Sequence, residues 1–499
     1  MNRIKKIILI NPPNIYKNGL SLTLKRVNIP LGLAYISSVL KNDYELSVID
    51  ALANDFNNKE YYCENYTYVG TNIDVLKKQI ADYAPDAAAI TCNLTTQHDM
   101  LIKTAEIIKQ INKNIIVIAG GQHPTLLYDK ILKNTNFIDY IILSEGENTI
   151  KKLFHNLNNS IDVTNLNGIA YKKNDGIIFN STPDIIQNLD EIQFPSWNLF
   201  PIEKYIQLGA PQNSFSKSKR CMPVITSRGC PFKCIFCSTH KHWRGTYRKR
   251  SIDNVIKEIL YLKNDFDIEE VQFLDDNLTI DLNFAKQLFK ELKKLNIYWC
   301  APNGISPNSV DSEALSLMKD SGCYEIAFAI ESGSQYVLNN IIKKNVDLKN
   351  ASNILAEAKK CGLYTHIYLI TGFPEETSGQ INETLCYPIK NLKNIDNPHI
   401  SVATPFPGTE LYNLCLKQKI IDENNSDYKT LELYNSCIST TEFNSADLLK
   451  KINFLLLKFH IFKCIFEPKC IYKNYIKKIF YDKKKFFYVL IEFIKGVFK

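Results

Sequence analysis

Short apolar runs alternate with longer amphipathic stretches over the first 160 residues of the chain. The runs are rich in β-branched residues and have the length of buried strands; they cover residues 7–10, 44–49, 87–91, 115–119 and 140–143. The stretches between them have the length of helices and cover residues 31–41, 73–83, 100–111 and 125–132. Strands that alternate with helices of this size predict an α/β fold with a Rossmann-like, doubly wound parallel sheet.

The alternation resumes after a connector over residues 161–215, in which one hairpin is predicted at 168–180. The strands of six further β/α units are predicted at 223–226, 270–274, 298–301, 325–330, 365–370 and 400–403. Six units predict a partial (β/α)6 barrel with its chemistry at the C-terminal ends of the strands. The predicted domains are therefore residues 1–160, the connector 161–215, a barrel over 216–430 and a helical, basic region over 431–499.

The net charge of +8 is concentrated at the end of the 499-residue chain. Residues 451–499 hold twelve Lys and three acidic residues, so the remaining 450 residues are close to neutral. A neutral body lacks the basic surface that binds nucleic acid, and no nucleic-acid partner is expected. The basic helices could contact an anionic membrane surface weakly or close the barrel with a solvated Lys face. We favour the second interpretation.

Fourteen cysteines are distributed along the chain. The sequence opens MNRIKKIILI, without the long apolar stretch of a signal peptide, and no apolar run is long enough to span a membrane. We therefore expect a cytoplasmic protein. In that reducing compartment, cysteines indicate metal binding or catalysis rather than disulfides.

Three cysteines form a Cys-x3-Cys-x2-Cys run directly after the first barrel strand. They are Cys230, Cys234 and Cys237. Thiolates of this kind bind iron–sulfur clusters or zinc. A structural zinc site needs four ligands, and only His240 and His242 are near enough in sequence to add one. Three thiolates on a four-iron cluster leave one iron open, and this alternative is favoured.

The cysteine run, with an aromatic Phe236 before its third cysteine, resembles the signature of the radical S-adenosylmethionine (SAM) superfamily. The resemblance implies that SAM binds the open iron of a [4Fe–4S] cluster through its amino and carboxylate groups. Reductive cleavage then gives a 5′-deoxyadenosyl radical, with the electron supplied by an external donor such as flavodoxin or ferredoxin. Later strand ends match the same superfamily, and the implied SAM-binding residues are Phe236, Asp275, Asp276, Glu331, Ser332 and Gly372.

The N-terminal segment resembles the cobalamin-binding domain of cobalamin-dependent radical SAM enzymes, a group that includes class B methyltransferases and magnesium-protoporphyrin cyclases. Glycine loops allow close approach to a large flat ligand, and polar strand-end residues can bind its amide arms. The implied cobalamin-binding residues are Asn11, Asn93, Thr95, Gly120, Gly121, His123, Glu145, Gly146 and Glu147. The Asp-x-His-x-x-Gly loop that ligates cobalt in cobalamin mutases is missing, so no protein histidine is expected on the metal.

These resemblances imply a cobalamin-dependent radical SAM enzyme, with methyl transfer to an unactivated carbon or phosphorus of a small molecule as the favoured reaction. In that scheme one SAM methylates the corrinoid and a second SAM generates the radical. A related enzyme that carries out oxidative cyclisation or rearrangement is the alternative. A cobalamin-binding sensor, with an idle cysteine run, is the alternative from another class. The sequence does not identify the substrate.

Overall fold

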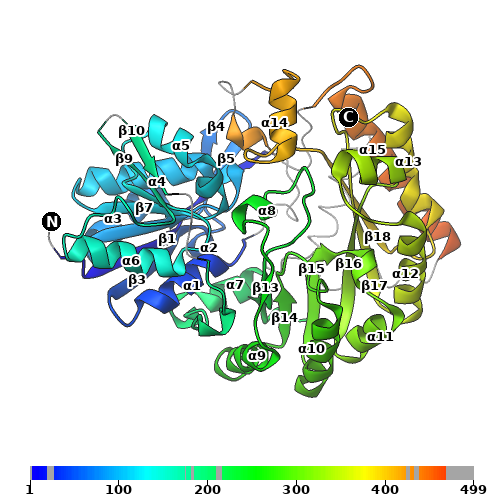
Figure 1. Ribbon diagram of the computed structural model, residues 1–499, viewed down its shortest axis with the longest axis horizontal. Coiled ribbons are helices and arrows are strands. Elements are labelled where there is room, and N and C mark those ends of the chain that lie inside the picture. The colour runs from blue at the N-terminus through cyan, green and yellow to red at the C-terminus, as the bar shows by residue number, and fades with distance from the viewer. Residues whose placement is uncertain are drawn as a thin grey trace.

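The computed structural model describes residues 3–18, 27–174, 176–180, 185–209, 216–422, 427–431 and 438–467. Two sheets lie side by side, and the N-terminal one (blue to cyan) faces a curved, barrel-like one (green to yellow) (Figure 1). The short helix α8 (Thr239–His242) lies between them. Both predicted α/β units are therefore present.

The N-terminal sheet has seven strands in the order β10-β9-β8-β7-β6-β1-β3. Its parallel strands are β1 (Lys6–Asn11), β3 (Glu45–Asp50), β6 (Ala87–Thr91), β7 (Ile116–Gly120) and β8 (Tyr140–Ile142). The helices around them are α1 (Leu31–Leu40), α3 (Ile73–Tyr83), α4 (His98–Ile111), α5 (Gln122–Asn134) and α6 (Glu147–Asn158). The chain reverses its direction of travel across the sheet between β1 and β6, and such a switch point opens a ligand crevice at the carboxyl ends of the strands.

Two features of this region go beyond the prediction. The hairpin β9 (Ile169–Lys173) and β10 (Gly176–Phe179), predicted within the connector, adds two antiparallel strands to the edge of the sheet at β8. A separate small sheet contains β2 (Asn14–Lys17), β5 (Tyr66–Val69) and β4 (Lys59–Cys63). Its strands have four or five residues each, too short for a clear alternation in the sequence.

The second sheet is a six-stranded, all-parallel partial barrel in chain order, as predicted. Its strands are β11 (Cys221–Val224), β14 (Glu270–Phe273), β15 (Tyr298–Ile305), β16 (Cys323–Glu331), β17 (Tyr364–Thr371) and β18 (Asn397–Val402). Its helices are α9 (Ile252–Phe266), α10 (Leu282–Leu295), α11 (Ser312–Asp320), α12 (Leu348–Lys360) and α13 (Ser378–Lys390). Each helix begins after a Ser, Asp or Thr whose side chain accepts a backbone N–H of the first turn, which is the usual N-cap.

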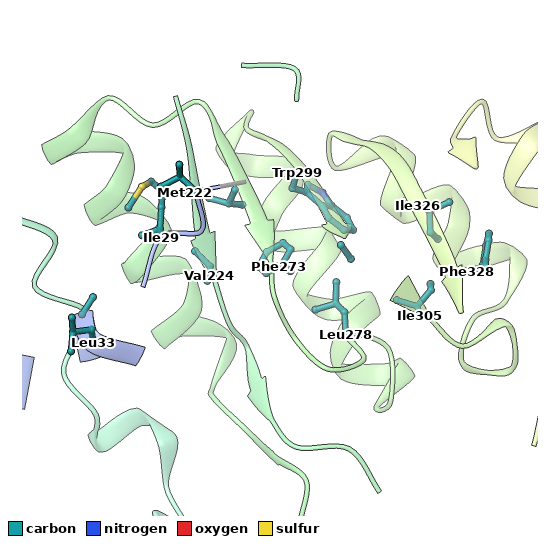
Figure 2. Close-up of a cluster of buried hydrophobic side chains, with 14 of the residues drawn as sticks. Ile29, Leu33, Met222, Val224, Phe273, Leu278, Trp299, Ile305, Ile326 and Phe328 are labelled. Atoms are coloured by element: carbon teal, nitrogen blue, oxygen red, sulfur yellow. The ribbon is translucent and has the colours of Figure 1, made fainter. Parts of the chain in front are cut away.

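One hydrophobic core runs from the N-terminal domain into the barrel. Ile29, just before α1, lies beside Met222 and Val224 of the first barrel strand (Figure 2), and Leu33 of α1 belongs to the same cluster. Because apolar surface is buried between the domains, separating them would expose it to water at a cost of roughly 25 cal/mol per Å². This shared core therefore holds the carboxyl ends of the N-terminal strands next to those of the barrel strands.

The helical C-terminal region is described only in part. Helix α15 (Ser445–Phe466) packs against α13 and β18. The region 468–499, which holds most of the predicted basic tail, lies outside the described residues. Among the helices that are described, none is both long and apolar enough to cross a membrane.

Candidate active site

A loop that carries the three cysteines leaves the barrel between β12 (Ser227–Arg228) and α8; we call residues 229–238 the cysteine loop. Gly229 has a left-handed φ of +94°, and a Cβ on it would lie 1.9 Å from the carbonyl oxygen of Thr246. Its N–H donates to Asp276 Oδ2 at 3.1 Å. The chain can make this turn before Cys230 only because residue 229 is glycine.

The three thiols are half-buried and close enough to affect one another. Burial raises the pKa of Cys230 to about 11 and that of Cys234 to about 12, and the pKa of Cys234 is raised further by both other thiols. The buried ammonium of Lys344 opposes this rise at Cys230 and Cys234. Thiols of this kind stay protonated without a partner and release their protons when they bind a metal.

The cysteine loop is also held by backbone hydrogen bonds to two other parts of the barrel. Ile235 donates its N–H to the carbonyl of Ile342 at 3.2 Å and accepts the N–H of Leu411 at 2.9 Å. The ring of Phe236 lies 6.3 Å from that of Phe373, in the loop after β17. The fold therefore brings the predicted Phe236 beside the fifth-strand loop.

The two predicted acidic residues after β14 have different surroundings. Asp275 is buried, and its Oδ1 accepts from the N–H of Thr226 at 3.1 Å and from its hydroxyl at 2.7 Å. Asp276 faces the cysteine loop, where it accepts from Gly229 and raises the pKa of Cys230 and Cys237. Burial raises the pKa of Asp276 itself to about 6. Asp276 lies at the cysteine loop, whereas Asp275 fastens β14 to the end of β11.

Glu331 ends β16 beside the thiols with a strained backbone. Its φ is +74°, which is uncommon for any residue but glycine, and such strain tends to occur at functional sites. Its Oε1 pairs with Lys344 Nζ at 2.8 Å, and that ammonium also donates to the Ala329 carbonyl at 2.7 Å. Lys344 follows a π-helical turn (Val337–Ile342), and no motif in the sequence identified it.

The remaining predicted SAM residues, Ser332 and Gly372, are bonded to residues outside the cysteine loop. Ser332 Oγ shares a hydrogen bond of 2.7 Å with Thr384 on α13. Gly372 has a φ of +86°, and its N–H donates to Glu376 at 2.6 Å. A Cβ at Gly372 would come within 2.6 Å of Leu448 on α15. The C-terminal helix therefore packs directly on the fifth-strand loop.

A cavity of about 270 Å³ opens at the carboxyl ends of β6, β7 and β8. Most of its lining is apolar or glycine, with Leu31, Leu33 and Ile36 of α1 on one side. Six of the nine predicted cobalamin residues line it: Asn93, Gly120, Gly121, Glu145, Gly146 and Glu147. The barrel supplies Ile225, Arg228, His242, Trp243 and Leu274. The crevice thus has walls from both domains.

Three predicted cobalamin residues lie elsewhere. Asn11 donates its amide to Asp50 at 2.9 Å. Thr95 begins a 3-10 turn (Thr95–Gln97) outside the cavity lining. His123 is buried in the first turn of α5, where its Nε2 lies 2.9 Å from His98 Nδ1. Burial lowers the pKa of His123 to about 3. The structure does not bring these three side chains to the crevice.

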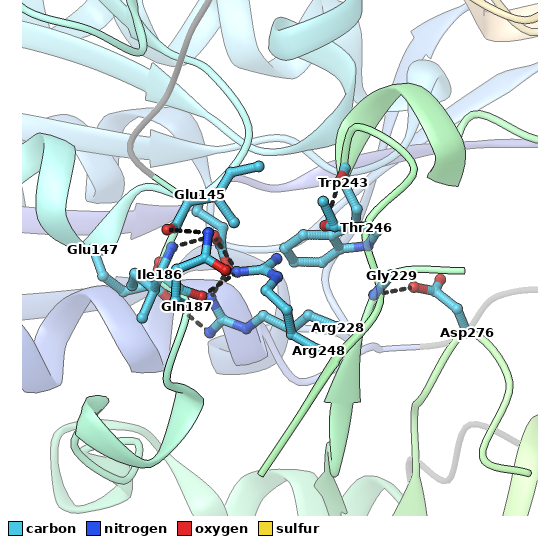
Figure 3. A network of polar contacts seen from close by, with 11 residues as sticks. Glu145, Glu147, Ile186, Gln187, Arg228, Gly229, Trp243, Thr246, Arg248 and Asp276 are labelled. Atoms are coloured by element: carbon cyan, nitrogen blue, oxygen red, sulfur yellow. Dashed lines mark hydrogen bonds and ion pairs between the residues drawn. The ribbon is translucent and has the colours of Figure 1, made fainter. Parts of the chain in front are cut away.

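Glu145 and Glu147 line the crevice, and their carboxylates are held by the barrel (Figure 3). Arg228 binds Glu145 at 2.8 Å and Glu147 at 2.6 Å, and Arg248 binds Glu145 at 2.7 Å. We call these four residues the junction network. Arg228 belongs to the sequence motif around the cysteines, but its partners are more than 80 residues away, so no local pattern assigned it this contact.

The donor set fits the predicted cofactors. In the described part of the chain, no three His, Cys, Asp or Glu side chains are grouped so as to hold a single metal ion. A four-iron cluster has a different requirement, because each thiolate binds a different iron. Three half-buried thiols on one loop, beside the carboxylate of Asp276 and the ammonium of Lys344, meet it. The apolar, glycine-lined crevice in turn suits a large flat ring.

Family comparisons agree with this architecture. The radical SAM superfamily matches residues 224–385, and the B12 binding domain matches residues 18–154. An uncharacterized methyltransferase of Pyrococcus horikoshii is 31% identical over 471 residues, which cover 93% of this chain and 95% of that protein. The chain therefore belongs to the radical SAM superfamily, in the group whose members also carry a B12 binding domain. The predicted enzyme class and its cofactors, a [4Fe–4S] cluster, SAM and cobalamin, are confirmed.

Two further relatives represent the two activities predicted from the sequence. The cytidylyl-2-hydroxyethylphosphonate methyltransferase of Streptomyces wedmorensis is 29% identical over 457 residues, 86% of this chain and 84% of that protein. The anaerobic magnesium-protoporphyrin IX monomethyl ester cyclase of Rubrivivax gelatinosus is 28% identical over 415 residues, 81% of this chain and 69% of that protein.

Solved structures share the fold. The cobalamin-dependent radical enzyme OxsB superimposes with a TM-score of 0.71 at 16% identity and covers 99% of this chain and 72% of its own. The radical SAM methyltransferase TsrM from Kitasatospora setae gives a TM-score of 0.66 at 15% identity, and the match covers 83% of this chain and 76% of TsrM. At these identities the likeness establishes the two-domain architecture.

Proposed function

We propose that this chain is a cobalamin-dependent radical SAM methyltransferase that acts on an unactivated carbon or phosphorus centre of a small molecule. One observation carries the proposal: the crevice of the B12 binding domain is walled by Arg228 and Trp243, which flank the cysteine loop on either side. A methyl carrier in the crevice and a radical source on the loop would therefore be neighbours. Proximity of this kind is what a two-cofactor transfer needs.

Each side of the junction has residues for its cofactor. Cys230, Cys234 and Cys237 hold the cluster, and Phe236, Asp276 and Glu331 surround the position where SAM would meet it. A carboxylate suits the ammonium of SAM or its ribose hydroxyls. Of the other SAM residues predicted, Asp275, Ser332 and Gly372 position the strand ends, because their polar groups bind Thr226, Thr384 and Glu376 rather than the cysteine loop.

When bound, the cluster supplies the electron that cleaves SAM, and the corrinoid carries the methyl group. The residues of the chain bind, orient and exclude water. Asn93, Gly120, Gly121 and Gly146 leave room at the strand ends for the ring edge. Apolar Leu31, Leu33 and Ile36 keep that wall dry. A dry site protects a radical from quenching and strengthens the electrostatic contacts within it.

A second cavity supports the expectation of a small-molecule substrate. It has a volume of about 500 Å³ and shares Ser144 with the crevice. His240, Lys241 and Arg244, on and after α8, form one side of it. Because α8 follows Cys237 closely, a molecule in this cavity would lie beside both cofactor sites.

The test is anaerobic reconstitution of the full chain with iron, sulfide and hydroxocobalamin, followed by reaction with SAM and a strong reductant. The proposal expects about four irons and one corrinoid per chain. It also expects both S-adenosylhomocysteine and 5′-deoxyadenosine, since methyl transfer consumes SAM in two ways. Reconstituted enzyme that never makes S-adenosylhomocysteine is not a methyltransferase.

The similarity to the Rubrivivax gelatinosus cyclase supports a second candidate, an oxidative cyclase or rearrangement enzyme that uses the same two cofactors. It would make 5′-deoxyadenosine with no matching amount of S-adenosylhomocysteine. The ratio of the two products in one assay therefore separates the candidates.

We propose an external one-electron donor of the flavodoxin or ferredoxin class and a cytoplasmic location, since a reduced cluster needs a reducing, low-oxygen compartment. A nucleic-acid partner is not expected of a neutral body. Weak membrane contact through the basic C-terminal helices stays a prediction that vesicle co-sedimentation can test.

A further inference from the structure

The two arginines of the junction network lie on the β-ribbon from which the cysteine loop extends. Strands β12 and β13 (Arg248–Lys249) form a two-stranded antiparallel ribbon, and the cysteine loop and α8 connect its two strands. In this ribbon Arg228 pairs directly with Arg248, and Ser227 pairs with Lys249. Two arginines opposite each other repel. The ribbon therefore needs anions beside it.

The anions come from the other domain. Glu145 follows β8 and Glu147 begins α6, and together they accept both guanidinium groups. All four side chains are at least nine-tenths buried, so the loss of one partner would leave a buried charge unpaired at a large cost. Ile186 completes the cluster, because its carbonyl accepts from Arg248 and its N–H donates to Glu145 at 3.0 Å. The base of the cysteine loop is thus neutralised by the B12 binding domain.

Arg228 also forms part of the crevice. Its guanidinium lies 5.1 Å from the ring centre of Tyr35 and 5.7 Å from that of Trp243, and all three residues line the cavity. Arg228 precedes Cys230 by two residues. The side chain of Arg228 therefore contacts the crevice wall and the carboxylates of the N-terminal domain, and its main chain leads into the cysteine loop.

We propose that Arg228 is a positioning residue that couples the two cofactor sites, so that filling the crevice favours cluster assembly and the assembled cluster favours filling the crevice. A ligand that packs against Tyr35 and Trp243 stabilises the arrangement in which Arg228 holds the ribbon. A cluster on the loop stabilises the same arrangement from the other side. Coupling between two binding sites is reciprocal. The inference rests on the proposed function, because it takes the two ligands to be a corrinoid and a four-iron cluster.

The test measures binding, with no turnover. Hydroxocobalamin is titrated into the full chain by absorbance, once with the cluster reconstituted and once after iron removal by a chelator. In the wild type we expect the cluster to tighten hydroxocobalamin binding about fivefold or more, the range typical of coupled sites. In Arg228→Lys the ratio should fall to near one, because an ammonium cannot span two carboxylates as a guanidinium fork does.

Lys249→Met is the matched control. Lys249 neighbours Arg248 on the same strand, but its ammonium pairs with Asp281 on the exposed side of the ribbon. This variant should keep the wild-type ratio. Glu147→Gln, which keeps the shape of the side chain and removes its charge, should behave as Arg228→Lys does and serves if the arginine variant does not fold.

The reverse measurement needs no variant. The rate at which a chelator removes iron from the wild-type protein should fall by a similar factor when hydroxocobalamin is bound. A wild-type affinity ratio of one, or an Arg228→Lys variant that keeps the wild-type ratio, overturns the coupling while leaving the proposed function intact. A wild-type chain that binds no corrinoid, or no iron, overturns the proposed function and the coupling with it.

Discussion

The N-terminal domain and the barrel are both parallel sheets that place their sites at the carboxyl ends of their strands, yet they build those sites differently. The barrel site consists of reactive side chains: three thiols, Asp276, Glu331 and Lys344 within electrostatic reach of one another. The crevice consists of backbone, glycine and apolar surface, and its two acidic side chains are bonded to the barrel.

The difference follows from what each ligand needs. An iron cluster needs covalent bonds from particular atoms, so the identity of a few residues decides its site. A corrin is large and flat, and it needs space, close backbone and a dry wall. The barrel site should therefore be sensitive to single side chains and the crevice to shape and backbone conformation.

The largest effect is expected from Cys234→Ala. Removing one of three thiolates leaves the cluster with too few ligands. The iron content should therefore fall from about four atoms per chain to a small fraction of that value. Formation of 5′-deoxyadenosine should fall to background, while corrinoid remains bound, with the weaker affinity of the cluster-free protein. Iron analysis measures the cluster, product chromatography measures 5′-deoxyadenosine, and absorbance measures the bound corrinoid. Cys386→Ala, at an exposed position on α13, is the control and should match the wild type; an active Cys234→Ala would point to a sensor with an idle cysteine run.

The next effect tests the backbone of the crevice. Gly121 has a φ of +111°, and a Cβ there would lie 2.6 Å from the Cys92 carbonyl oxygen, whereas a Cβ on Gly120 meets nothing within 4 Å. Gly121→Ala should lower the free energy of unfolding by roughly 1–3 kcal/mol and weaken corrinoid binding, with the cysteine loop still able to take up iron. Gly120→Ala should leave stability unchanged. Equal urea midpoints for the two variants would contradict this account.

A smaller effect separates the two neighbouring acids of the barrel. Asp275→Asn removes the charged acceptor of Thr226 and should cost about 1–3 kcal/mol of unfolding free energy. Asp276→Asn should leave the melting temperature nearly unchanged and reduce SAM cleavage about tenfold, the scale of one lost charged contact. Melting curves and 5′-deoxyadenosine rates check both. Reduced cleavage with normal stability in Asp275→Asn would reverse the assignment.

The smallest effect is a pH dependence in the N-terminal domain. Burial lowers the pKa of His123 to about 3, below the usual value of about 6.5. Between these values the unfolded chain binds a proton that the folded chain does not, so stability is lost as pH falls below 6.5. From pH 7.5 to 5.5 the loss should be about 1.4 kcal/mol. Urea unfolding of wild type and His123→Gln at both values measures it, and a slope unchanged by the substitution would assign the loss to other groups.

Local patterns predicted most of the architecture because they reflect local physics. The helix at Ile73–Tyr83 and the strand at Ala87–Thr91 lie where the periodicity placed them. The cysteine run was equally clear, since ligand spacing is a property of one loop. The hairpin β9 and β10 was recognised as a hairpin, but its place in the N-terminal sheet was not, because strand neighbours are chosen over long distances in the chain.

The sequence by itself determined the two α/β units, their order and the residues able to hold a cluster, because period and spacing are encoded within a few residues. Only the tertiary structure decided which polar residues face a ligand and which hold the protein together. In the structure Asp276 faces the cysteine loop whereas Asp275 binds Thr226, and His123 lies outside the crevice lining. Glu145 and Glu147 form ion pairs with Arg228. Burial selects among chemically equal side chains, and it depends on contacts between distant segments, which for Arg228 and its two glutamates lie more than 80 residues apart.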